Sequence, residues 1–248
     1  MKFKHLLLAT YFSFALTPLS MAKSAKDLFY QGVNAYEKDN YTQAAKLWEQ
    51  ACNDGYAVGC LTLGLLYENG QGVKQNYTQA AKLYEIACNG GIKDGCHNLG
   101  LLYANGQGVK QNYSKAAKFY EIACNSRDTD SCINLGNLHR NSKNYIQAVR
   151  LYEKACNNGN AMGCFSLGNS YINGQGVKQN YIQAIKSYEQ SCNGGYANAC
   201  FVLGALYSVG QGVRQNYFVA KEYFGKACDL GLQQGCDAYK KLNQMGVP

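Results

Sequence analysis

The residues best suited to chemistry in this chain are its twelve cysteines, which fall into six pairs with seven residues between the two members of each pair. Thiols can bind metal ions, act as nucleophiles or oxidise to disulfides. Metal sites usually bring Cys-x2-Cys spacings or paired histidines, and neither accompanies these cysteines. The sequence therefore predicts disulfides and no metal site. The pairs are Cys52 and Cys60, Cys88 and Cys96, Cys124 and Cys132, Cys156 and Cys164, Cys192 and Cys200, and Cys228 and Cys236.

Two pairings of these cysteines have to be compared. Cys60 can pair with Cys52 across 8 residues or with Cys88 across 28 residues. The longer pairing would leave the first and the last cysteine without partners, and in one repeat it would have to bridge 24 residues instead of 28. Pairing across 8 residues uses every thiol. We therefore predict six short-range disulfides and no free thiol for nucleophilic catalysis.

The N-terminus indicates export. Residues 1–5 carry two lysines, residues 6–18 are apolar and uncharged, and small residues stand at the last and third-last positions before Lys23. This pattern predicts a cleaved signal peptide over residues 1–22. We expect a secreted or periplasmic protein, a setting in which disulfides persist, and no membrane span.

The elements that position the cysteines repeat along the chain. The cysteine pairs recur every 36 residues, with one shorter period of 32 from Cys124 to Cys156. In one unit, residues 60–67 and 77–88 carry apolar side chains at helical spacing, and the glycine-rich residues 69–73 lie between them. Periods of this length are typical of stacked helical hairpins. We predict an all-α fold, an α/α solenoid of helix-turn-helix repeats.

The ends of the array differ from its middle. Leu28 stands where the first helix of the other repeats carries a cysteine, and Lys240 stands where they carry a glycine. Terminal repeats with atypical outer faces are expected in solenoids. The resulting division is a single solenoid domain over 23–248, with a capping hairpin at 23–52, repeats at about 53–88, 89–124, 125–156, 157–192 and 193–228, and a capping helix at 229–248.

Two further residue types recur in register. A glycine follows the first-helix cysteine by four positions, as at Gly64, although glycine costs a helix about 0.5–1 kcal/mol relative to alanine. We predict that it lets a neighbouring helix backbone come close. The tyrosines, including Tyr113, are predicted to lie mostly in the core, and His139 occupies a tyrosine position and is predicted to replace it there.

The motif Leu-Gly-x-Leu-Tyr-x-Asn-Gly-x-Gly-Val at residues 63–73 and 99–109, and in varied form at 167–177, resembles the Sel1-like repeat. Together with the cysteine pairs and the signal peptide, it resembles the Helicobacter cysteine-rich protein family over residues 25 to about 243. The resemblance implies a disulfide-clamped solenoid related to tetratricopeptide repeats, secreted or periplasmic. Members are named β-lactamases or penicillin-binding proteins and are also discussed as host-interaction proteins.

The residues themselves offer no active site for such a hydrolase. The one Ser-x-x-Lys match, Ser20 to Lys23, straddles the predicted cleavage site, and Ser-Asp-Asn and Lys-Thr-Gly are absent. Two histidines, His97 and His139, remain beyond the signal peptide, too few for a zinc cluster, and no cofactor is predicted. Three functions stay open: a secreted adaptor for peptides or host proteins, a hydrolase or binder of β-lactams or cell-wall peptides, and a structural component of the envelope.

Polar side chains gather in the first helices of the central repeats. Amides carry both donors and acceptors and suit an extended peptide backbone, and an arginine suits a carboxylate. We predict a peptide groove formed by Asn98, Asn134, Asn137, Arg140, Ser166 and Asn169, in a protein that acts as a monomer. The alternative is that these positions simply face solvent. The net charge of +8 is scattered along the chain, so nucleic acid is not expected as a partner.

Overall fold

The computed structural model describes residues 24–248, and the predicted signal peptide lies outside them. The described residues form helices and no strand, so the predicted all-α fold is confirmed. The helices are α1 (Ala25–Tyr36), α2 (Tyr41–Asn53), α3 (Ala57–Asn69), α4 (Tyr77–Asn89), α5 (Lys93–Asn105), α6 (Tyr113–Asn125), α7 (Thr129–Asn141), α8 (Tyr145–Asn157), α9 (Ala161–Asn173), α10 (Tyr181–Asn193), α11 (Ala197–Val209), α12 (Tyr217–Asp229) and α13 (Gln233–Gln244).

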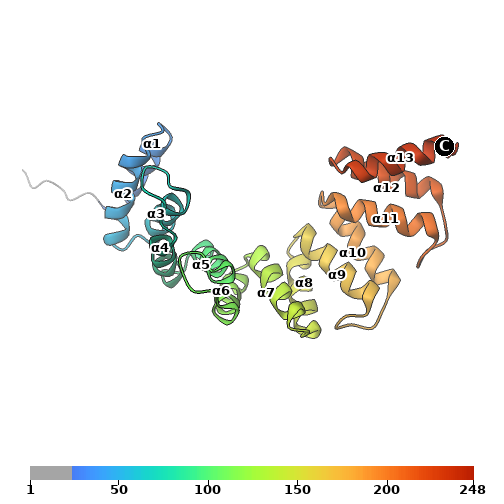
Figure 1. The fold of residues 1–248 in the computed structure, drawn as a ribbon, viewed down its shortest axis with the longest axis horizontal. Coiled ribbons are helices and arrows are strands. Elements are labelled where there is room, and N and C mark those ends of the chain that lie inside the picture. The colour runs from blue at the N-terminus through green and yellow to red at the C-terminus, as the bar shows by residue number, and fades with distance from the viewer. Residues whose placement is uncertain (1–23) are drawn as a thin grey trace, which may run out of the picture.

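The helices stack in chain order into an open curve whose two ends, α1 and α13, lie on the same side (Figure 1). Each odd-numbered helix packs against the even-numbered helix that follows it, and each hairpin packs against the next one. Nearly all helix contacts join sequence neighbours, as in other solenoids. The curve is therefore built from one packing arrangement repeated along the chain.

Asparagine side chains start most of the second helices of the hairpins. Asn76 precedes α4, and its Oδ1 accepts a hydrogen bond from the backbone N–H of Gln79 at 3.1 Å. This bond satisfies one of the N–H groups that a helix leaves without an intrahelical partner. The predicted cap at Asn76 is confirmed. At the other end of the connecting turn, Gly70 takes a left-handed conformation and ends α3.

The recurring glycines accommodate an aromatic ring, so the predicted close approach of a helix backbone is wrong. A Cβ atom on Gly64 would lie 2.6 Å from Cε1 of Tyr84, which belongs to the second helix of the same hairpin. Tyr84 is fully buried by this packing. The same arrangement joins Gly32 to Trp48, Gly100 to Tyr120, Gly136 to Tyr152, Gly168 to Tyr188 and Gly204 to Phe224.

All twelve cysteines form disulfides, and the pairing across 8 residues is confirmed. Cys52 in α2 bonds Cys60 in α3, with their Cα atoms 4.7 Å apart. Each disulfide joins the second helix of one hairpin to the first helix of the next. The bridges therefore hold together the surfaces between hairpins, whereas packing around the glycines holds each hairpin together. The other five bridges join Cys88 to Cys96, Cys124 to Cys132, Cys156 to Cys164, Cys192 to Cys200 and Cys228 to Cys236.

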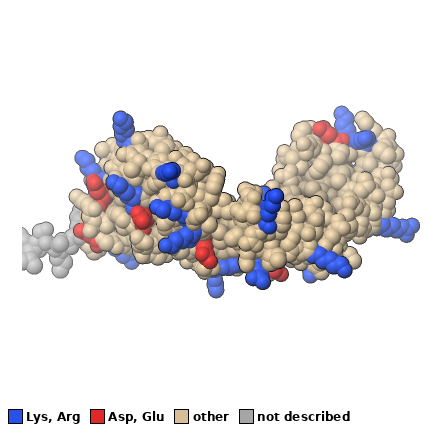
Figure 2. Space-filling view, turned by 60° about the horizontal axis from the view of Figure 1, so that its bottom comes forward, with Lys and Arg blue, Asp and Glu red and all other residues tan. Residues whose placement is uncertain are grey.

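Basic side chains are spread along the whole length of the face shown in Figure 2, and the fewer acidic ones lie among them. Between residues 24 and 248, no helix combines the length and apolar character that crossing a bilayer requires.

Candidate functional site

The six residues predicted to form a peptide groove lie at the second, fifth and eighth positions after the cysteine in successive first helices. Such positions fall on one side of a helix. We call this set the amide stripe: Asn98 on α5, Asn134, Asn137 and Arg140 on α7, and Ser166 and Asn169 on α9. Arg140 is exposed and the other five are half-buried.

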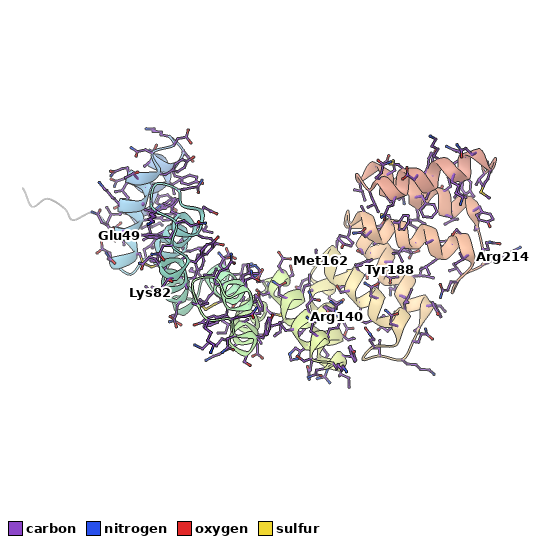
Figure 3. The ribbon with its side chains drawn as sticks, in the orientation of Figure 1. Glu49, Lys82, Arg140, Met162, Tyr188 and Arg214 are labelled. Atoms are coloured by element: carbon purple, nitrogen blue, oxygen red, sulfur yellow. A yellow bond between two sulfur atoms is a disulfide. The ribbon has the colours of Figure 1, made fainter. Side chains whose placement is uncertain are left out.

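Two asparagines of the amide stripe are held in place by buried tyrosines. The Tyr152 hydroxyl donates to Oδ1 of Asn137 at 2.8 Å, and the Tyr188 hydroxyl donates to Oδ1 of Asn169 at 2.7 Å. Tyr188 lies on α10, in the right-hand part of the curve in Figure 3. Burial raises the pKa of both tyrosines above its ordinary value, so both hydroxyls keep the proton that they donate. With their oxygens engaged, these two side chains have amide N–H donors left to offer to a ligand.

The other repeats lack this tyrosine–asparagine bond: Leu101 stands at the fifth position opposite Tyr120. Where the fifth position after the cysteine is Ala205, the ring on the next helix is Phe224, which has no hydroxyl. In the repeat that begins with α3, the Tyr84 hydroxyl donates to Glu68 instead. Burial first, and then the Glu68 carboxylate, raises the pKa of Tyr84, while a hydrogen bond from Asn98 lowers it. Asn98 is thus already engaged with a core tyrosine.

Arg140 lies at the C-terminal end of α7 (Figure 3) and has no acidic partner among the described residues. Its positive charge opposes the rise that burial causes in the pKa of Tyr152. Arg140 follows Asn137 by three positions in α7, so the two residues lie on the same side of the helix. The structure thus places Asn134, Asn137 and Arg140 along one side of α7 and Ser166 and Asn169 along one side of α9, and no hydrogen bond is recorded between members of the amide stripe.

A cluster of serine, histidine and aspartate went undetected in the sequence. Nδ1 of His97 lies 2.8 Å from Oγ of Ser131 and 2.9 Å from Oδ2 of Asp128. A serine hydrolase needs the serine and the carboxylate on opposite ring nitrogens, whereas here both contact the same nitrogen. Ser131 is also fully buried, out of reach of a substrate. This cluster therefore gives the hydrolase alternative no support.

The cluster instead joins two hairpins. His97 belongs to α5, whereas Ser131 lies in α7 and stands where most other first helices have the glycine that precedes the cysteine. Asp128 is the cap of α7 and accepts a hydrogen bond from the Ser131 N–H at 3.1 Å. The sequence signal for this cluster was a single serine in place of a glycine, together with a histidine in the repeat before it. This signal becomes informative only once the position of the neighbouring hairpin is known.

We expect Asp128→Ala to lower the free energy of unfolding by roughly 1–3 kcal/mol, because it removes both a helix cap and a carboxylate that contacts Nδ1 of His97. Urea unfolding followed by circular dichroism would measure the loss. Asp94→Ala is the matched control, since Asp94 lies in the first turn of α5 without a recorded hydrogen bond. Equal, small losses in the two variants would contradict the role assigned to Asp128.

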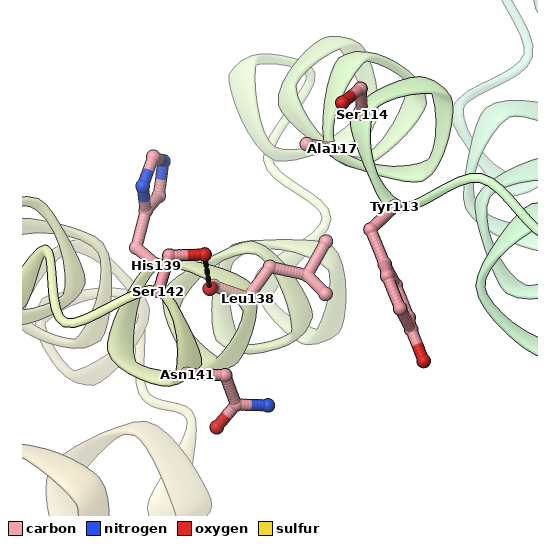
Figure 4. Close-up of a pocket in the computed structure, with 7 residues that line it drawn as sticks. All are labelled: Tyr113, Ser114, Ala117, Leu138, His139, Asn141 and Ser142. Atoms are coloured by element: carbon pink, nitrogen blue, oxygen red, sulfur yellow. Dashed lines mark hydrogen bonds between the residues drawn. The ribbon is translucent and has the colours of Figure 1, made fainter.

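Two residues predicted to lie in the core, Tyr113 and His139, border a cavity between α6 and α7. Tyr113 is 57% exposed, and His139 is only partly buried. The cavity has a volume of about 370 Å³ (Figure 4). The predicted core position of Tyr113 is therefore wrong, whereas His139 is partly buried like the tyrosines at its position in the other repeats, Tyr67, Tyr103, Tyr171 and Tyr207.

Two solved structures match the fold over most of the described residues. A protective antigen present in uropathogenic Escherichia coli strains, described as displaying an SLR fold, is 27% identical with a TM-score of 0.84. The match covers 90% of this chain and 50% of the antigen. A Sel1 repeat protein from Oxalobacter formigenes is 24% identical with a TM-score of 0.76, covering 89% of each chain.

Curated relatives come from Helicobacter pylori and match short stretches. HcpE, provisionally named a β-lactamase, is 51% identical over 43 residues, which are 17% of this chain and 12% of HcpE. HcpC, named in the same way, is 39% identical over 57 residues, or 23% of this chain and 20% of HcpC. The predicted resemblance to the Helicobacter cysteine-rich proteins is thus confirmed, over a small part of their length.

Six consecutive stretches match the Sel1 repeat, and together they cover most of the chain. The matched residues are 18–56, 57–92, 93–128, 129–160, 161–196 and 197–232. The helical hairpins and the fold of the two solved structures agree with this assignment. The chain therefore belongs to the Sel1 repeat family.

Proposed function

We propose that this protein is an extracytoplasmic scaffold, acting as a monomer, whose amide stripe binds an extended segment of a partner protein. The Sel1 repeat fold is a scaffold suited to protein binding. Disulfides form and persist in oxidising compartments, and all twelve cysteines are bridged, which supports a place outside the cytoplasm.

The observation that carries this proposal is the anchoring of Asn137 and Asn169. Their oxygens are engaged by buried tyrosine hydroxyls, which fix the direction of the amide groups. A fixed donor loses little conformational freedom when a ligand binds, so more of the interaction energy appears as affinity. The carbonyls of an extended peptide are suitable acceptors for these N–H groups.

The neighbours of these asparagines define the chemistry of the segment. Arg140 is exposed and without an acidic partner among the described residues, so it suits an acidic side chain or a C-terminal carboxylate. Along the same stripe, the earlier repeats carry Leu65 and Leu101 in place of the asparagines. Leu65 is 38% exposed and offers apolar surface. We therefore expect an extended segment with an apolar part and a carboxylate near Arg140.

Random twelve-residue peptides with free C-termini, selected on the immobilised oxidised protein, would supply a ligand. We expect N137D/N169D to bind the selected peptide at least tenfold more weakly than the wild type. Aspartate keeps the oxygen that accepts from Tyr152 or Tyr188 but lacks the amide donors. Fluorescence anisotropy of the labelled peptide would measure the affinity.

The matched control is N53D/N89D, which introduces the same two charges at exposed asparagines at the ends of α2 and α4. This control should bind like the wild type. Arg140→Gln should weaken binding of the peptide that has a free C-terminal carboxylate, and should leave binding of the C-terminally amidated peptide unchanged. Wild-type affinity in N137D/N169D, or an equal loss in the control, would overturn the proposal.

A further inference from the structure

The turn between α7 and α8 is shorter than the equivalent turns in most other repeats. It consists of residues 142–144, whereas residues 106–112 connect α5 to α6. This difference accounts for the single 32-residue period in the chain. The missing residues correspond to the Gly-Gln-Gly-Val segment of the longer turns.

In four repeats this segment covers the start of a helix in the preceding hairpin. The backbone of Gly108 rests on the first peptide of α4, so closely that a Cβ atom would collide with Tyr77. The Thr78 hydroxyl donates to the carbonyl oxygen of Gly108 at 2.9 Å. Gly108 has a φ of +67°, which glycine adopts readily. The same close contact is made by Gly72 with the start of α2, by Gly176 with the start of α8 and by Gly212 with the start of α10.

The start of α6 has no such cover because the turn that would supply it is the shortened one. The apolar side chains around it, on α6 and α7, are consequently more exposed than their equivalents in other repeats. Tyr113 is 57% exposed, Ala117 is partly exposed where Ala81 is 5% exposed, and Leu138 is partly exposed where Leu102 is 1% exposed. These three side chains line the cavity in Figure 4, where Leu138 points toward Tyr113.

Other cavities of about 340 and 440 Å³ lie elsewhere along the array. The cavity at α6 is the one that lies next to the shortened turn, between the hairpins α5–α6 and α7–α8.

The cavity at α6 also keeps the hydroxyl group that holds the turn in two of the four covered repeats. Ser114 occupies the position of Thr78 and Thr42, whose hydroxyls donate to the carbonyls of Gly108 and Gly72. Ser114 is exposed, and its hydroxyl has no recorded partner among the described residues. Apolar surface, a hydroxyl donor and the first peptide of the helix are thus all present without the segment that covers them elsewhere.

We infer that this cavity binds a glycine-containing turn from a partner protein, which takes the place of the chain's missing segment. A glycine with positive φ lies over the first peptide of α6, and its carbonyl accepts a hydrogen bond from Ser114. An aliphatic side chain after it packs against Ala117 and Leu138, as valine does in the chain's own turns. This site uses residues of α6 and α7 outside the amide stripe and does not depend on the function proposed for the stripe.

The probe is a head-to-tail cyclic peptide that contains the sequence of residues 105–112, Asn-Gly-Gln-Gly-Val-Lys-Gln-Asn. Added to the 15N-labelled oxidised protein, it should shift the amide signals of residues 113–117 and 138–142. Alanine in place of the second glycine of the peptide should weaken binding at least tenfold, because its Cβ collides with the start of α6. Ser114→Ala, an exposed substitution that leaves the fold intact, should weaken binding about fivefold through the lost hydrogen bond.

A second variant restores the cover. Replacing Ser142 and Lys143 by the sequence of residues 106–111 converts the short repeat into a 36-residue one, and should abolish binding of the cyclic peptide while peptides selected on the amide stripe still bind. Equal binding of the cyclic peptide to this variant, or shifts elsewhere in the spectrum, would overturn the inference. Self-association of the wild type that the restored turn abolishes would also overturn it, by assigning the cavity to a second copy of the chain.

Discussion

Reduction of the six disulfides should lower the free energy of unfolding enough to leave the protein largely unfolded at 37 °C. Each bridge closes a loop between cysteines 8 residues apart. The chain-entropy relation gives about 2.5 kcal/mol for such a loop, or roughly 15 kcal/mol for six as an upper figure. The net stability of a folded domain is only about 5–15 kcal/mol. Thermal melts followed by circular dichroism, with and without a phosphine reductant, would measure the effect, and an unchanged melt would refute it.

The effect of losing a single bridge should depend on its place in the array. Each disulfide joins neighbouring hairpins, so replacing Cys124 and Cys132 by serine weakens the contact between α1–α6 and α7–α13. We expect two separate unfolding transitions in that variant. Replacing Cys228 and Cys236 by serine should loosen α13 alone, and hydrogen exchange would show faster exchange only there. Identical exchange patterns in the two variants would contradict this account.

The parts of the fold that the sequence predicted correctly are local and periodic. A cysteine spacing repeated six times leaves one pairing that uses every thiol, whatever the tertiary structure. The cap at Asn76 involves a residue three positions away, and the apolar positions of each helix follow from its own period. Such features need no knowledge of which helix packs against which, so they could be read from residue order alone.

The parts that the sequence could not predict depend on what faces each side chain. Gly64 was expected to face a helix backbone, and the partner is the Tyr84 ring, 20 residues along the chain. The pairing of Asn137 with Tyr152 left no consistent trace in the sequence, because a tyrosine also occurs where the fifth position is a leucine, as with Leu101 and Tyr120. The short period was visible as well. That it leaves the start of α6 uncovered could be recognised only once the structure showed which helix starts the longer turns cover.

The Gly136 position tests this packing most directly, because alanine there is expected to destabilise a helix that it would otherwise favour. A Cβ atom on Gly136 would lie 2.6 Å from Cε1 of Tyr152, and the hydrogen bond from Tyr152 to Asn137 restrains the ring from moving away. We expect Gly136→Ala to lower the free energy of unfolding by about 2–3 kcal/mol in urea titrations, since overpacking outweighs the gain of up to about 1 kcal/mol in helix propensity.

The same substitution at Gly225 should have the opposite sign. Gly225 lies inside α12, and a Cβ atom there would lie 3.4 Å from the nearest ring atoms of Tyr239, an ordinary contact. Only the helix propensity then changes, and Gly225→Ala should raise the free energy of unfolding by about 0.5–1 kcal/mol. The cost of Gly136→Ala should also shrink in a Tyr152→Leu background, because the opposing ring is gone. Destabilisation of equal size at both glycines would mean that the tyrosine ring is not what requires glycine at position 136.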